Sequence, residues 1–76
     1  MEEMPLPEEI KEKILQRVSN RALALRAFEY IKLVKREDGT LWVKEELEDT
    51  NNHAFLFMVL SCVNYAQRIL RGEDID

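Results

Sequence analysis

The sequence predicts a small all-α domain, a bundle of three helices in which the C-terminal helix is the central hydrophobic element. Apolar residues recur at helical spacing in three stretches of the 76-residue chain. Nine of the ten residues from 54 to 63 are apolar, and a helix without a broad polar face has to be buried on more than one side. We therefore expect one domain over residues 1–76, with helices at 7–18, 20–37 and 50–71.

The first expected helix begins at Pro7, because proline at the first helical position loses no hydrogen bond and the two following glutamates favour the positive end of the helix dipole. Ile10, Ile14 and Val18 then recur every four residues, which is typical of one buried face. Asn20, which follows closely, is a good N-cap for a second helix.

Residues 20–37 fit two readings, a helix or the approach to a β-hairpin. As a helix, their apolar residues gather on one face and their charged residues on the opposite face. As a strand, each face would mix apolar with charged side chains. The helix is therefore favoured, and the alternative is an α+β fold with a β-hairpin at about 28–47 that turns at Asp38 and Gly39.

Residues 38–49 are expected to connect the second helix to the third. The third helix should begin after Asp49 or Thr50 and end at Gly72, since glycine commonly follows a helix. Residues 1–6 and 73–76 are expected to be short, flexible, acidic ends.

On a helical wheel, two apolar residues of the last helix lie on its polar face. Phe57 and Leu60 lie within an arc of otherwise polar residues, with Leu56 at its edge. Burying each would contribute about 1.5–3 kcal/mol, so exposing both to water wastes stability in a small domain. We expect these residues to contact another chain or to lie under the 38–49 connection. Trp42, in that connection, either covers the core or anchors a partner.

The small size of the chain also favours association. A domain of this length buries only about 60% of the surface of its unfolded chain, and the single cysteine excludes an internal disulfide. The expected function is therefore a non-enzymatic protein–protein interaction module. It would be a homodimer or an accessory or regulatory subunit of another protein, and it would associate through its C-terminal helix.

The sequence contains no catalytic, cofactor-binding or metal-binding motif, and we expect no cofactor. His53 is expected to belong to the start of the last helix, and Cys62 to be a buried, inert thiol. Four acidic residues between 45 and 49 lack the spacing and the glycine of a calcium loop. Without a signal peptide or a long apolar span, the chain is expected to be cytoplasmic and not to enter a membrane.

A nucleic-acid-binding regulator is the alternative function. The expected second helix would carry a basic face able to contact phosphates, although the net charge of −4 argues against nucleic acid as a partner. The residues of this basic face are Arg21, Lys32, Lys35 and Arg36.

Overall fold

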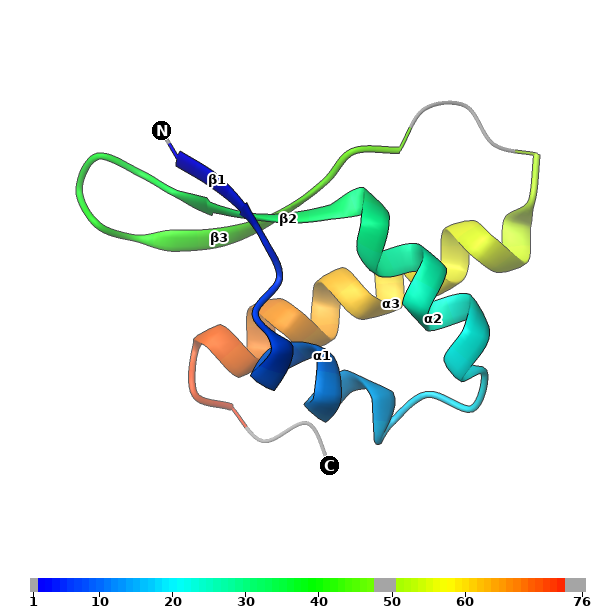
Figure 1. The fold of residues 1–76 in the computed structure, drawn as a ribbon. Coiled ribbons are helices and arrows are strands. Elements are labelled where there is room, and N and C mark those ends of the chain that lie inside the picture. The colour runs from blue at the N-terminus through cyan, green and yellow to red at the C-terminus, as the bar shows by residue number, and fades with distance from the viewer. Residues whose placement is uncertain (1, 48–50, 74–76) are drawn as a thin grey trace.

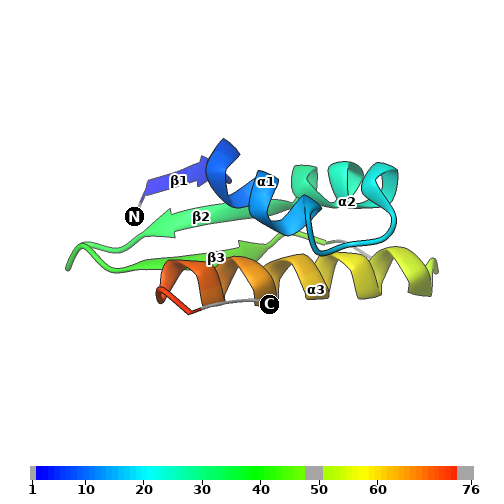
Figure 2. The ribbon, with the colours of Figure 1, turned by 90° about the horizontal axis from the view of Figure 1, so that it is seen from below.

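The chain folds into two layers, a three-stranded antiparallel sheet with helices on one face (Figures 1 and 2). The structure, a computed structural model, describes residues 2–47 and 51–73. The strands lie in the order β1-β2-β3. In chain order the elements are β1 (Glu2–Pro5), α1 (Glu8–Leu15), α2 (Arg21–Ala27), a 3-10 turn (Phe28–Tyr30), β2 (Ile31–Lys35), β3 (Leu41–Glu45) and α3 (His53–Leu70).

The expectation of an all-α bundle is therefore wrong, and the chain has an α+β fold with a hairpin within residues 28–47. The helix expected over 20–37 ends at Ala27, and Ile31 already has the extended backbone angles φ −121° and ψ 130°. Ile31 and Leu33 point into the core, where Ile31 is completely buried. Pairing with strands on both sides satisfies the backbone of β2, which outweighs the helix propensity of the preceding residues.

The outer face of β2 mixes apolar and charged residues, and for this reason the sequence pattern did not favour a strand. Val34 lies on the face without helices, next to charged residues, and yet only 2% of it is exposed. Its cross-strand partner is Trp42, whose side chain lies on the same face. The guanidinium carbon of Arg36 lies 5.0 Å from the centre of the indole ring. Trp42 therefore covers Val34, so an apolar residue on this face is still buried.

The β2–β3 hairpin turns at the pair of residues that the alternative reading indicated. The backbone N–H of Arg36 donates to the carbonyl of Thr40 at 2.9 Å, and Gly39 adopts φ +88°, which glycine tolerates best. The Asp38 carboxylate accepts hydrogen bonds from the Thr40 hydroxyl at 2.7 Å and from its backbone N–H at 3.0 Å. The hydroxyl bond is the main reason why the pKa of Asp38 is lowered.

Residues 2–5, expected within a flexible acidic end, form the edge strand β1 instead. Met4 pairs with Leu33 and Pro5 with Lys32. Proline and glutamate are poor strand formers, but an edge strand tolerates proline, because one side of its backbone has no partner strand. At the other end of the chain, Glu73 forms an ion pair with Arg71 at 2.7 Å, and residues 74–76 lie outside the described part.

The first and last helices are confirmed, with shorter bounds than expected. Asn20 caps α2 by accepting the N–H of Leu23 at 3.0 Å, and Asn52 caps α3 by accepting the N–H of Phe55 at 3.1 Å. The caps expected at 49 and 50 lie outside the described residues.

The core lies between the two layers and consists of Leu6, Ile10, Ile14, Ala24, Ala27, Phe28, Ile31, Leu33, Val43, Phe55, Val59, Cys62 and Ala66.

Candidate functional site

The outer face of α3 carries the most exposed large apolar residue in the described part of the chain. Phe57 is 72% exposed and Leu60 is 44% exposed, while Leu56 beside them is half-buried. Their exposed neighbours on this face are small or polar. We call this surface the α3 outer row, and its residues are His53, Ala54, Phe57, Leu60, Ser61 and Asn64.

One of the two expectations for Phe57 and Leu60 does not hold. The described part of the 38–49 connection forms the hairpin turn and β3, and it leaves both side chains exposed. Contact with another chain therefore stays a prediction for Phe57, Leu60 and Leu56. On the opposite side of α3 the helical wheel predicts buried residues, and Phe55 and Val59 do lie in the core.

The α3 outer row is also free of formal charge. Residues 53–67 contain no aspartate, glutamate, lysine or arginine, although 34% of the chain is charged. Depletion of charged residues is the feature that distinguishes the core of a protein interface from other surface. The row therefore combines exposed apolar area with an absence of charge.

A shallow hollow of about 270 Å³ lies beside Phe57. One wall comes from α3 and includes Ser61 and Tyr65, and the other comes from residues 17–19, between α1 and α2. Sequence reasoning missed this second wall. No pattern connects segments some forty residues apart, because their contact depends on how the helices pack.

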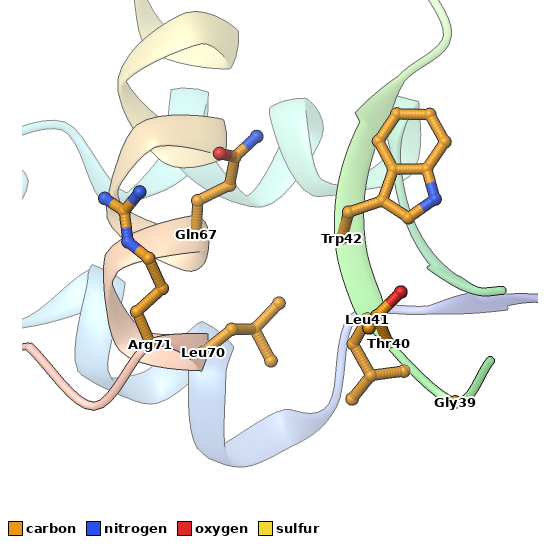
Figure 3. A pocket seen from close by; sticks show the side chains of 7 residues that line it. All are labelled: Gly39, Thr40, Leu41, Trp42, Gln67, Leu70 and Arg71. Atoms are coloured by element: carbon orange, nitrogen blue, oxygen red, sulfur yellow. The ribbon is translucent and has the colours of Figure 1, made fainter.

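Trp42 is not part of this surface. Figure 3 shows its indole on β3 pointing away from α3. A second hollow of about 390 Å³ separates the start of β3 from the end of α3, where Gln67 Nε2 donates to the carbonyl of Val43 at 3.5 Å. Trp42 covers Val34 on the outer sheet face, so the structure does not join it to Phe57 and Leu60 in one interface.

The basic face expected for nucleic-acid binding is absent, because its residues do not share a helix. Arg21 begins α2, and Lys32 and Lys35 lie on opposite faces of β2. Arg36 stacks on Trp42 at the hairpin turn. These four cations therefore do not form one phosphate-binding stripe.

Charged residues on the outer sheet face form ion pairs with one another. Lys44 pairs with Glu46 at 3.4 Å and with Glu3 at 3.7 Å on the outer sheet face. The pKa of Glu46 is lowered, mainly by a hydrogen bond with the Glu3 side chain and also by Lys44. Among the described residues, no three His, Cys, Asp or Glu side chains are placed to hold a metal ion.

The two candidate reactive side chains, His53 and Cys62, do not meet. His53 is exposed at the start of α3. Cys62 is buried in the core, and burial raises the pKa of its thiol to about 11, so the thiol is protonated at neutral pH. A nucleophile with an adjacent base is therefore not assembled from these two residues.

No protein-family model, curated protein or solved structure matches the chain. None of the described helices is both long and apolar enough to cross a membrane.

Proposed function

We propose that this chain is a non-enzymatic protein–protein interaction module that binds another chain through the α3 outer row. The observation that carries the proposal is the 72% exposure of Phe57. A phenylalanine at the middle of an uncharged helix face contributes little to the fold there, whereas its burial by a partner would contribute about 1.5–3 kcal/mol to binding.

Three further features support the proposal. Leu60 adds exposed apolar area one turn along α3, and the hollow beside Phe57 offers space for a partner side chain. Aromatic residues that fill pockets supply much of the binding energy of protein interfaces. The separation of His53 from the buried Cys62 is compatible with a non-enzymatic role.

For the location of the protein we propose the cytoplasm. The single cysteine is a free, buried thiol, which is usual in a reducing compartment.

The proposal can be tested with a photo-crosslinking amino acid placed at position 57 in the organism that encodes the protein. The matched control places the same group at Leu25, which is 52% exposed on α2 and does not line the hollow beside Phe57. We expect covalent adducts from position 57, fewer of them when Leu60→Ser is added, and none above background from position 25.

Equal adduct yields from the two positions, or none from position 57, would contradict the proposed function. Because Phe57, Leu60 and Leu25 are all exposed, these changes should leave the fold intact. Circular dichroism and the thermal midpoint of each variant check this directly.

A further inference from the structure

We infer that the partner of the α3 outer row is a second copy of this chain, with the two α3 helices packed antiparallel across a two-fold axis between Phe57 and Leu60. This inference rests on the proposed function, and it adds the identity and the orientation of the partner.

The spacing of the row is the first argument for an antiparallel pair. His53, Phe57, Leu60 and Asn64 follow one another at intervals of four, three and four residues, which is the spacing of a helix–helix seam. An axis midway between Phe57 and Leu60 sets each Phe57 against the partner's Leu60. The same axis sets each His53 against the partner's Asn64, because both pairs have the same midpoint. Apolar layers then lie at the centre and polar layers at both sides, which suits an isologous contact.

Charge is the second argument. In a two-fold interface each surface meets its own copy, so a charged patch near the axis would face like charge. No formally charged residue occurs between 53 and 67, and of the residues that line the hollow beside Phe57 only Arg17 is charged, so like charge that could face its copy is limited there to one residue per chain. A strongly charged foreign helix would find no opposite charge on the row itself, and beside the hollow it would find only Arg17.

Shape is the third argument. Each side chain at a helix seam fits between four residues of the facing helix. For the partner's Phe57, these four would be Phe57, Leu60, Ser61 and Asn64. Ser61 and Asn64 are smaller than the apolar pair, and Ser61 opens onto the hollow of about 270 Å³. The row thus offers both an exposed ring and space for a second one.

The size of the row sets the expected strength of the pair. With the axis midway between Phe57 and Leu60, the two α3 helices face each other over residues 53–64, a length of about 18 Å, and such a contact buries less than about 1,000 Å², which is in the range of weak, transient pairs. We therefore expect a reversible dimer with a dissociation constant roughly in the micromolar range. Its population should depend on protein concentration.

Sedimentation equilibrium of the purified chain, from low micromolar to millimolar concentration, measures this dimer. Phe57→Ser and Leu60→Ser should each weaken dimerisation by about tenfold or more, since both occupy the central layers. Leu25→Ser, the same change on an exposed helical leucine of α2, should leave the dissociation constant unchanged. A monomer at every concentration, or an equal effect of Leu25→Ser, would overturn the inference.

Engineered cysteines test the orientation. In the double variant His53→Cys with Asn64→Cys, the two positions within one chain are about 16 Å apart along α3, too far for a bond within the chain. Antiparallel pairing should make this variant form covalent dimers on mild oxidation, while each single variant should form no covalent dimer. The buried Cys62 should not interfere. Covalent dimers from Asn64→Cys alone would indicate a parallel pair and would overturn the antiparallel arrangement.

The two proposals fail in different ways. Adducts from position 57 with other proteins only, together with a monomeric purified chain, would overturn the second-copy partner and leave the interaction module standing. Absence of any adduct from position 57 would overturn both. An adduct with twice the 9.0 kDa mass of the chain supports both.

Discussion

Trp42 and Phe57 show how differently two aromatic residues of one small domain can be placed. Trp42 lies on the outer sheet face, where it covers Val34 and holds the guanidinium of Arg36 against its ring. Phe57 covers nothing in its own chain to a comparable degree, since 72% of it is exposed. The residue type of a large apolar side chain therefore does not tell whether it stabilises the fold or is available to a partner. Its exposed fraction and its contacts within the chain do.

Replacement of Trp42 tests its structural role. Trp42→Ala should lower the free energy of unfolding by about 2 kcal/mol, because it removes a large half-buried side chain and exposes Val34. Trp42→Phe should cost much less, since the ring still covers Val34 and the buried indole N–H donates to no described residue. Urea unfolding measures both changes. Equal losses for alanine and phenylalanine would show that ring coverage is not what stabilises this face.

At the scale of elements, the start of α2 at Asn20 was predicted from the sequence, whereas the end of α2 and the strand β2 were not. Asn20 and Asn52 each accept a backbone N–H three residues later, which is a local interaction that sequence displays directly. β2 depends on partners at both sides, β1 from the start of the chain and β3 beyond the turn. Its pattern therefore could not be judged without knowing that Trp42 lies opposite Val34.

The cap of α3 gives a test at this scale. Asn52→Ala should destabilise the protein by about 1 kcal/mol, because the N–H of Phe55 loses its acceptor at the start of the longest helix. Asn51→Ala is the matched control, since Asn51 precedes the capping residue. Thermal unfolding of both variants makes the comparison. A loss of stability from Asn51→Ala as large as that from Asn52→Ala would contradict this assignment.

At the scale of the whole molecule, two layers leave two large faces uncovered. The principal extents of 35, 30 and 16 Å describe a flat domain. The helices cover the inner sheet face, while the outer sheet face is protected by Trp42 and by ion pairs of Lys44. The outer face of α3 has no such protection at Phe57. This asymmetry is what directs the functional proposal to α3.

Cys62 reports on the whole fold, because it is buried where α3 meets the rest of the core. Its thiol should react with an aromatic disulfide reagent only as fast as the protein unfolds, and denaturant should accelerate the reaction. Rapid reaction of the native protein would contradict this. The rate is read from absorbance of the released thiolate, with the unfolded chain as the reference.

The raised pKa of Cys62 also predicts how stability depends on pH. The folded state has a pKa of about 11 against an ordinary value of 9.0, so folding favours the protonated thiol. Its contribution to stability is fully present below about pH 9 and is lost as the pH rises through about 11. As the pH rises from about 9 to about 11, the wild type should therefore lose free energy of unfolding relative to Cys62→Ala, which has no thiol to ionise. A constant difference would contradict the assignment.

The sequence by itself determined the features that depend on neighbours along the chain. These are the helical periodicity of α1 and α3, the cap at Asn20, the turn residues at Asp38 and Gly39, and the exceptional position of Phe57 on its helix. Each follows from spacing or from a local hydrogen bond. The candidate site on α3 was predictable for the same reason, because a helical wheel needs only one segment.

Tertiary structure decided what depends on distant partners. Residues 31–35, expected to be helical, form a strand, and residues 2–5 form the edge strand beside it. Trp42 and Phe57 lie on different surfaces. Tertiary structure also dispersed the basic residues and built the hollow beside Phe57 from segments far apart in sequence. The physical reason is that backbone pairing and burial are satisfied between elements, so their free energy outweighs local propensity only once the partners are in place.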